Sequence, residues 1–252
     1  MEKIDFERRF GGIRRLYGET AFARFQQAHV CVVGVGGVGS WVAEALARSA
    51  IGKITLIDLD HVAESNVNRQ IHALEDNFGK AKVTAMAERI RAINPRCEVI
   101  SLEEFVATDN LDAMLGQGYD YVIDAIDSAR VKAEMIAWCR RHKVPLIASG
   151  GAGGRIDVTR IALADLSRTV QDPLLSRVRT LLRRDFGFPK DPKKKFGVAC
   201  VFSSEPLRRP EAACEAGADA LTGLNCAGFG SATSVTASFG LMMVGEVLKQ
   251  LS

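Results

Sequence analysis

The chain has 252 residues, of which 47% are hydrophobic and 25% are charged. This composition is that of an ordinary globular protein and excludes disordered, collagen-like and fibrous classes. The 33 basic and 30 acidic residues give a net charge of only +3, too close to balance for the whole molecule to be a nucleic-acid binder. The length predicts a single α/β domain over residues 1–252.

The six cysteines form no CxxC pair, which excludes a zinc ribbon and a thioredoxin-type motif. Their scatter, together with a charged N-terminal segment that lacks an apolar core, predicts a cytoplasmic protein without a signal peptide. One uncharged stretch, from Cys226 to Val244, is long enough to approach the span of a bilayer. Because it is rich in Gly, Ser and Thr, we expect a buried helix there, and peripheral or C-terminal membrane association is the less favoured alternative.

Short apolar strands alternate with helical stretches along the first part of the chain, which is typical of a parallel sheet with crossover helices. After a leading helix at 19–27, the pattern predicts strands at 30–33, 54–57, 97–102, 121–123 and 145–148, and helices at 37–49, 80–93 and 128–141. Beyond a glycine-rich loop at 150–154 we expect extended structure at 156–163, an Arg-rich helix at 172–185 and a last helix at 235–251. The predicted fold class is α/β, a Rossmann-like doubly wound and mainly parallel sheet with crossover helices and a C-terminal extension.

Charge distinguishes an N-terminal core at 1–165 from the C-terminal extension at 166–252. The extension contains a basic segment at 177–209 with ten Lys or Arg against three acids, whereas the rest of the chain carries 23 basic and 27 acidic residues. Its prolines and glycines predict that much of this segment is loop. The charge predicts contact with RNA phosphates, with a solvated loop unrelated to RNA as the alternative. The candidate RNA contacts are Arg177, Arg179, Arg183, Arg184, Lys193, Lys194 and Lys195.

A glycine-rich motif at 34–39, GVGGVG, lies between the first predicted strand and the helix that follows it. The first glycine permits a tight turn, the second lets a phosphate approach the backbone, and the third permits close packing of the helix on the strand. N–H groups at the start of the helix attract the anion. The motif therefore predicts a nucleotide site at Gly34, Gly36, Gly37 and Gly39.

Asp58 ends the second predicted strand, where a carboxylate accepts hydrogen bonds from ribose hydroxyls, as NAD and ATP both require. Arg69, in the long polar loop that follows, and Lys82, at the next helix start, add two cations. They favour a nucleoside triphosphate, because the charge on its phosphates has to be offset during transfer. Asp127, after the fourth strand, supplies an oxygen ligand of the kind that Mg²⁺ prefers. The residues predict ATP and Mg²⁺, with an NAD-dependent oxidoreductase as an alternative.

In combination these residues resemble the ubiquitin-activating-enzyme-like adenylating family, which includes the activators of molybdopterin and thiamin sulfur-carrier proteins. The resemblance rests on GxGGxG at 34–39, DxDxVxxSNxNRQ at 58–70, GxxK at 79–82 and DxxD at 124–127. It implies that a carboxylate attacks the α-phosphate of ATP and that Arg69, Lys82 and Asp127 are catalytic, with Asp127 holding Mg²⁺. The nucleotide contacts that it implies are Gly34, Gly36, Gly37, Gly39, Asp58, Asp60, Asn66, Arg69, Gln70 and Lys82.

The same resemblance implies a homodimer in which an arginine from the partner's N-terminal segment completes the site. The candidates for that arginine are Arg9, Arg14 and Arg15.

Within that family the sequence is most similar to a branch that acts on tRNA. This similarity rests on RFGGIRRLYG at 9–18, NRQIHAL at 68–74, VIDAIDS at 122–128, GGAGG at 150–154, QDPL at 171–174 and GFGSAT at 228–233. It implies ATP-dependent cyclisation, with loss of water, of threonylcarbamoyladenosine next to the tRNA anticodon, through adenylation of the threonyl carboxylate. An adenylating activator of a ubiquitin-like sulfur-carrier protein is the alternative, although the paired CxxC motifs of many such proteins are missing.

Two further expectations concern sulfur. A cysteine desulfurase or another sulfur acceptor is a candidate partner, and Cys226, before the last predicted helix, is the candidate reactive thiol. A buried, inert cysteine is the favoured alternative for Cys226. DNA is not an expected partner.

Overall fold

The computed structural model describes residues 5–208 and 229–252. Within those ranges the α-helices are α1 Phe6–Tyr17, α2 Glu19–Gln27, α3 Gly39–Arg48, α4 Lys82–Ile93, α5 Leu111–Leu115, α6 Ala129–His142, α7 Pro173–Asp185 and α8 Thr233–Leu251. The strands are β1 His29–Val33, β2 Lys53–Ile57, β3 Glu98–Leu102, β4 Tyr121–Asp124, β5 Leu146–Ser149, β6 Ile161–Asp165 and β7 Ala199–Ser203. Short 3₁₀ turns occur at η1 Glu64–Asn66, η2 Glu75–Asn77, η3 Val158–Arg160 and η4 Leu166–Arg168.

The strands form one seven-stranded sheet in the order β3-β2-β1-β4-β5-β7-β6. All neighbouring pairs are parallel except β6 and β7, which are antiparallel. From β1 the chain crosses to β2 on one side, and it later returns to place β4 on the other side. The connections after β1 and β4 therefore leave the sheet in opposite directions, which opens a crevice at the carboxyl ends of these strands. This arrangement confirms the predicted Rossmann-like, mainly parallel sheet.

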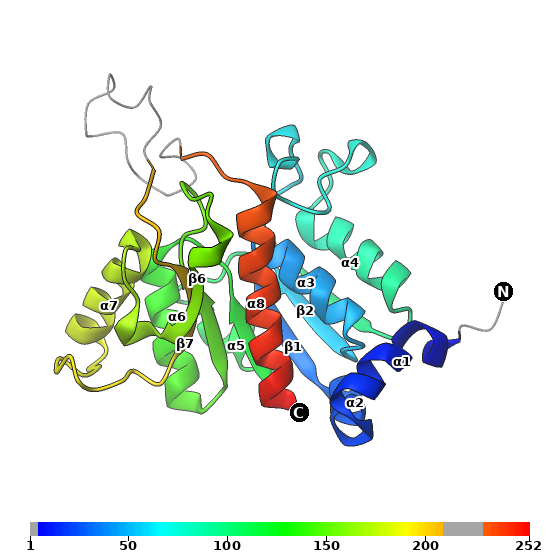
Figure 1. Ribbon diagram of the computed structural model, residues 1–252, viewed down its shortest axis with the longest axis horizontal. Coiled ribbons are helices and arrows are strands. Elements are labelled where there is room, and N and C mark those ends of the chain that lie inside the picture. Colours follow the sequence, from blue (N-terminus) through cyan, green and yellow to red (C-terminus); the bar gives the residue numbers. More distant parts are fainter. Residues whose placement is uncertain (1–4, 209–228) are drawn as a thin grey trace.

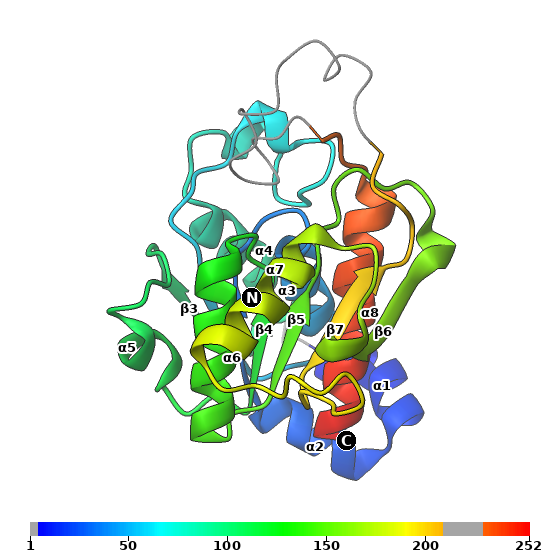
Figure 2. The same cartoon turned by 90° about the vertical axis from the view of Figure 1, so that its left-hand side faces the viewer.

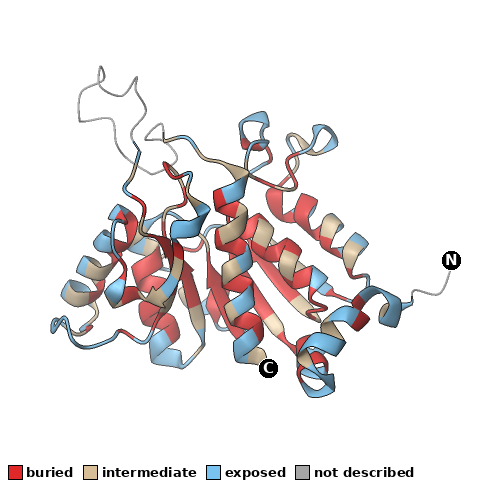
Figure 3. Cartoon of the chain, viewed as in Figure 1, coloured by how far each residue is buried: buried red, intermediate tan, exposed pale blue. Residues whose placement is uncertain are grey.

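Helices cover both faces of the sheet (Figures 1 and 2). On one face α3, α4 and α8 pack on the strands in the largest apolar cluster of the described residues, and on the other face α5, α6 and α7 do so in two smaller ones. Strands covered on both faces are expected to be almost continuously apolar. Accordingly β1, β2 and β4 are buried along nearly their whole length. Figure 3 shows the buried residues gathered on the strands and on the helix faces that cover them.

Every strand and helix predicted in the first 150 residues is present, with shifts of at most a few residues at the ends. Two α-helices and one strand of the described chain were not predicted, namely α1, α5 and β7, and the extended structure predicted at 156–163 is the turn η3 followed by β6. Helix α1 contains Gly11 and Gly12, which lower helix propensity, and α5 has only five residues. Strand β7 lies inside the basic segment at 177–209, so this segment is loop only in part. It contains the end of α7 and a buried strand between β5 and β6.

Helix α8 lies in the groove between α3 and the sheet strands β5 and β7 (Figure 1). Its apolar residues, including Val235, Phe239 and Met243, are buried, which confirms the predicted packing helix at the end of the chain. No helix among residues 5–208 and 229–252 is long and apolar enough to cross a membrane.

Gly240 of α8 lies at the closest contact between α8 and α3. A Cβ added there would lie 2.8 Å from the carbonyl oxygen of Val38 and 3.0 Å from the Cβ of Trp41. Only a residue without a side chain permits this approach. Gly245, one turn further along the same helix, has no atom within 4 Å of an added Cβ.

We expect Gly240→Ala to lower the free energy of unfolding by about 1–3 kcal/mol, because α8 must move away from α3. Gly245→Ala is the matched control. It should raise the free energy of unfolding by up to about 1 kcal/mol, since alanine favours helix and no contact opposes it. Urea unfolding of the two variants measures both effects, and equal effects would show that the α3–α8 contact does not limit the residue at 240.

Candidate functional site

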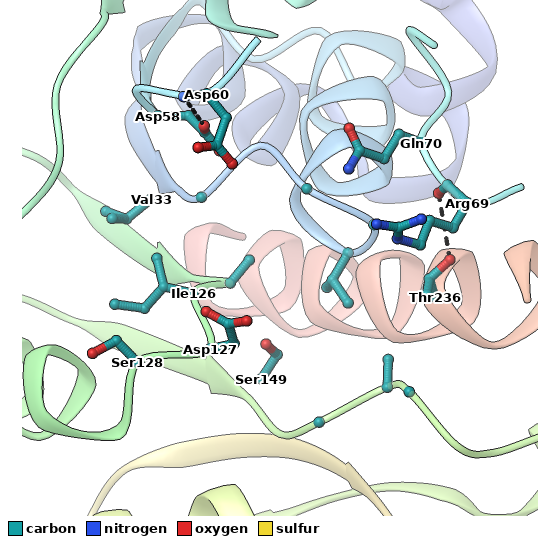
Figure 4. A pocket seen from close by; sticks show the side chains of 18 of the residues that line it. Val33, Asp58, Asp60, Arg69, Gln70, Ile126, Asp127, Ser128, Ser149 and Thr236 are labelled. Atoms are coloured by element: carbon teal, nitrogen blue, oxygen red, sulfur yellow. Dashed lines mark hydrogen bonds between the residues drawn. The ribbon is translucent and has the colours of Figure 1, made fainter. Parts of the chain in front are cut away.

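A cavity of about 630 Å³ lies in the crevice at the carboxyl ends of β1, β2, β4 and β5 (Figure 4). Its walls come from the glycine-rich loop after β1, the polar loop after β2, the turns after β4 and β5, and the start of α8. The cavity gathers nearly all of the predicted nucleotide and catalytic residues, namely Gly34, Gly36, Gly37, Asp58, Asp60, Asn66, Arg69, Gln70, Lys82 and Asp127. Gly39 is the one predicted residue of this set that does not line it.

The glycine-rich loop is compact because two of its glycines meet. Gly34 has φ +86°, in the left-handed region that favours glycine, and a Cβ on Gly39 would lie 1.8 Å from the carbonyl oxygen of Gly34. Gly39 therefore permits the close packing of α3 on β1 and has a structural position behind the loop. Gly36, by contrast, has open space where a Cβ would point, which leaves its backbone accessible from the cavity.

Asp58 anchors the loop and is itself held in place. Its carboxylate accepts hydrogen bonds from the backbone N–H groups of Val35 at 2.6 Å and Asp60 at 2.9 Å. Burial raises the pKa of Asp58, and nearby Lys82 and the two hydrogen bonds oppose this rise. The ammonium of Lys82 lies 2.6 Å from a carboxylate oxygen of Asp60 and 3.9 Å from one of Asp58. The carboxylate of Asp58 is thus held in place to accept from a ligand hydroxyl, and the ammonium of Lys82 is held in place to contact a ligand phosphate.

Arg69 spans the cavity wall next to the glycine-rich loop (Figure 4). Its aliphatic stem lies 3.3–3.4 Å from the position of a Cβ on Gly37. Its Nη1 donates to the carbonyl oxygen of Ser65 at 2.6 Å and to Oδ1 of Asn68 at 3.0 Å. The carbonyl oxygen of Arg69 in turn accepts a hydrogen bond from Nε1 of Trp41 at 3.0 Å. These contacts fix a positive charge beside the loop.

Asp127 is exposed and points into the cavity from the turn after β4 (Figure 4). The turn is shaped by Asp124, which is fully buried, pairs with the buried ammonium of Lys132 at 2.7 Å and accepts a hydrogen bond from the N–H of Ile126 at 3.2 Å. Burial raises the pKa of Asp124, and Lys132 counteracts it. Asp124 therefore positions the turn and does not line the cavity. The described residues contain no group of three acidic, His or Cys side chains that could hold a metal ion.

A second buried ion pair supports the opposite wall, and the sequence did not indicate it. The guanidinium of Arg155 lies 3.7 Å from the carboxylate of Asp172 and donates to the carbonyl oxygens of Gly151 at 3.0 Å and Gln171 at 2.8 Å. Asp172 also accepts from the N–H of Gly151 at 2.9 Å and begins α7 as its N-cap. The wall at 149–153 is thereby fixed to α7. In the sequence, Gly151 and Asp172 belonged to the GGAGG and QDPL segments, which supported the family resemblance but predicted no contact between them.

The predicted RNA contacts do not lie at the cavity. The guanidinium groups of Arg179 and Arg183 are used within the protein: Arg179 donates to Oγ1 of Thr169, and Arg183 lies 5.2 Å from the ring centre of Phe196. Arg177 and Arg184 are exposed on α7, where Arg184 pairs with Asp185. The exposed Lys193, Lys194 and Lys195 lie in the loop that enters β7 at its amino end. Because β7 runs parallel to β5, that loop lies at the amino ends of the strands, whereas the cavity lies at their carboxyl ends (Figure 1).

Cys226 lies outside the described residues. The described cysteines, Cys31, Cys97, Cys139 and Cys200, are buried and form no disulfide. Burial raises the pKa of Cys97 and Cys139 to about 12, so these thiols are not poised to react at neutral pH.

The candidate partner arginines are on α1, near the amino ends of the strands (Figure 1). Arg14 pairs with Glu7 and Glu19, Arg9 donates to main-chain oxygens at the end of α4, and Arg15 is exposed. None of the three lines the cavity of its own chain.

Comparison with known proteins now assigns the family. A model of the ThiF family matches residues 11–252. The chain belongs to the ThiF family. This confirms the resemblance to adenylating enzymes and leaves the NAD-dependent oxidoreductase without support.

Some relatives match nearly the whole chain, and others match about half of it. The chain is 55% identical to tRNA threonylcarbamoyladenosine dehydratase of Escherichia coli over 98% of this chain and 94% of that protein. A crystal structure of the E. coli dehydratase in complex with ATP has a TM-score of 0.89 at 53% identity and covers 100% of this chain and 96% of that one. Molybdopterin-synthase adenylyltransferase of Salmonella typhimurium is 33% identical, over only 50% of each chain.

Proposed function

We propose that this protein is an ATP-dependent tRNA threonylcarbamoyladenosine dehydratase. The observation that carries the proposal is that the glycine-rich loop, Asp58, Arg69, Lys82 and Asp127 all line one cavity. The chain that builds this cavity is similar along nearly its entire length to a dehydratase whose structure holds ATP. The activity is that of a ligase-type adenylating enzyme.

The residues support a sequence of two steps. In the first, an oxygen of the threonyl carboxylate attacks the α-phosphorus of ATP, the bond from that phosphorus to the bridging oxygen breaks, and pyrophosphate leaves. Arg69 and Lys82 offset the negative charge that develops on the phosphates, while Asp58 accepts from the ribose hydroxyls. The backbone at Gly36 and Gly37 allows the phosphates to approach the start of α3.

In the second step an atom of the carbamoyl group attacks the activated carbonyl carbon and loses its proton. The bond to the phosphate oxygen breaks, and AMP leaves with the carboxylate oxygen. The nucleoside thereby loses the elements of one water, while ATP becomes AMP and pyrophosphate. Both reacting groups are on one nucleoside, so the attack gains from proximity and requires no protein nucleophile. The inert cysteines of the described chain agree with this chemistry.

We propose that Asp127 holds Mg²⁺ when ATP is bound. The exposed carboxylate that Asp127 brings to the cavity suits this ion, because protein sites often bind Mg²⁺ through one or two carboxylates together with phosphate oxygens and water. When bound, the ion would supply positive charge to the phosphates.

We also propose that the protein is a homodimer. Strand β6 is one of the two edge strands of the sheet, no described strand pairs with its outer side, and its Leu163 is 40% exposed. Three further apolar side chains are exposed nearby: Ile156 just before η3, Val158 in η3 and Leu241 in α8. Helix α8 contacts both η3 and β6. An uncovered edge strand with apolar neighbours is a surface that proteins normally pair or cover. A second copy of the chain would cover this surface.

The cysteine desulfurase partner and the cytoplasmic location stay predictions.

The catalytic prediction concerns Asp127. Incubation of the wild-type protein with ATP, Mg²⁺ and tRNA bearing threonylcarbamoyladenosine should remove one water from the nucleoside, as followed by mass spectrometry. Asp127→Asn retains the shape of the side chain and removes its charge, and it should lower kcat by about a hundredfold or more. An unchanged nucleoside mass with folded wild-type protein would refute the proposed function.

The RNA-binding prediction concerns Lys193, Lys194 and Lys195. Replacing all three by Gln should weaken tRNA binding and reduce the slope of log affinity against log salt by about two to three, while kcat stays unchanged because the loop is remote from the cavity. The control replaces the exposed Arg141, Lys143 and Lys249 and removes the same charge. If tRNA affinity falls equally in both variants, the effect comes from net charge alone, and the loop has no specific role in RNA binding.

The assembly prediction concerns the edge strand. Leu163→Asp should convert the dimer to a monomer in sedimentation equilibrium, because a carboxylate would be buried without a partner at the interface. Leu74→Asp, an exposed leucine on the polar loop after β2, should leave the mass unchanged. A wild-type protein that sediments as a monomer would refute the dimer.

A further inference from the structure

A second hollow, of about 580 Å³, lies beside the nucleotide cavity. It is formed by the loop at 64–69 on one side and by residues 229–231 on the other. Arg69, Phe229 and Ser231 line both the nucleotide cavity and this hollow. The two spaces therefore adjoin, and among the described lining residues Arg69 is the one charged side chain that they share.

Hydrogen bonds fix residues 229–233 as a strap between the two walls. The carbonyl oxygen of Gly230 accepts from the N–H of Gly154 at 2.8 Å, which ties the strap to the wall after β5. On the other side, Nδ2 of Asn68 donates to the carbonyl oxygen of Ser231 at 2.8 Å, and Oγ1 of Thr233 donates to the carbonyl oxygen of Asn68 at 2.5 Å. The hollow thus has defined walls.

Arg69 directs its charge to the boundary of the two spaces. Its stem covers Gly37 of the nucleotide loop, whereas Nη1 bonds to Ser65 and Asn68, which line the second hollow. An anion in either space can reach the guanidinium, which offers several donors in a planar fork. Two anions that must react with each other, a carboxylate and an α-phosphate, would meet at this position.

The other lining groups suit a nucleoside better than a second phosphate chain. Ser65, Ser231 and Asn68 offer hydroxyl and amide groups, Val67 offers an exposed apolar surface, and Phe229 offers an aromatic ring. Proteins recognise unstacked RNA bases by stacking on aromatic rings and by hydrogen bonds to their edges. Among the described residues that line the hollow, Arg69 is the one cation and Glu64 the one acid, so they supply no second positive charge to offset a polyphosphate.

We propose that the second hollow is the acceptor subsite, which receives the modified nucleoside turned out of the RNA, with its carboxylate at Arg69 and its base against Phe229. The proposal rests on the proposed function and adds to it the place where the RNA substrate enters. Enzymes that act on a base commonly extrude it into a separate pocket. The alternative occupant with a carboxylate, the C-terminal peptide of a ubiquitin-like protein, is distinguished by the test.

The test compares two substitutions that add the same charge at equally exposed positions. Val67 lines the hollow and is 56% exposed, and Leu74, in the same polar loop but outside both hollows, is 55% exposed. Val67→Glu should raise the KM for an anticodon stem-loop bearing threonylcarbamoyladenosine by about tenfold or more, because the added carboxylate repels that of the substrate. Leu74→Glu should change this KM by less than about twofold, and both variants should bind ATP like the wild type in calorimetric titration.

A second pair of variants tests stacking. Phe229→Ala should reduce the preference for the modified over the unmodified stem-loop, whereas Phe229→Tyr, which retains the ring, should preserve it. If wild-type protein converts the nucleoside but Val67→Glu has the same KM as Leu74→Glu, the subsite is wrong while the function stands. If wild-type protein leaves the nucleoside unchanged, the function fails, and the subsite fails with it.

A peptide arm completes the experiment. Exchange of labelled pyrophosphate into ATP that depends on a peptide ending in Gly-Gly, and that Val67→Glu abolishes, would overturn the assignment of the hollow to RNA. Absence of peptide-dependent exchange, together with the expected KM values for the stem-loop, supports it.

Discussion

The reversal of strand order between β1 and β4 is the constraint on which the site depends. Because β2 lies on one side of β1 and β4 on the other, the loops after these neighbouring strands diverge and cannot fill the space between them. The glycine-rich loop can turn within that space only because Gly39 has no side chain to meet Gly34. The N–H of Val35 is then directed to Asp58 at the end of β2. This hydrogen bond joins the loops that follow the adjacent strands β1 and β2, on one side of the crevice.

Buried charge maintains the rest of the cavity wall. The pairs Asp124–Lys132 and Arg155–Asp172 are nearly inaccessible to solvent, and removing water from such groups costs several kcal/mol per ion. Apolar residues of similar size would stabilise the fold at least as well. They could not hold the backbone of the two turns, since Asp124 and Asp172 accept from main-chain N–H groups and Arg155 donates to main-chain oxygens. These pairs orient the turns that carry Asp127 and Gly150–Gly153.

The sequence predicted the central strands and most of the polar residues that line the cavity, because both depend on local patterns. Apolar runs such as 30–33 and the GVGGVG motif specify a strand, a turn and a helix start within a few residues. It did not predict β7, because ACVFS follows a Pro- and Lys-rich loop and pairs with β5 and β6 at long range. The sequence also could not place the basic segment. Its charge is visible in the sequence, but whether it lies at the amino or the carboxyl ends of the strands depends on the direction of β7. The buried partners Arg155 and Asp172 are likewise brought together only by folding.

The C-terminal extension is a structural part of the nucleotide site and not an addition to it. β7 separates β5 from β6, so the sheet of residues 1–165 would have a gap without it. α8 packs on α3 through Gly240, next to the carbonyl oxygen of Val38 in the glycine-rich loop. Thr236 of α8 donates to the carbonyl oxygen of Arg69 at 3.5 Å, and the strap before α8 separates the nucleotide cavity from the second hollow. Residues 166–252 therefore support the glycine-rich loop from behind and form part of the wall between the cavity and the second hollow.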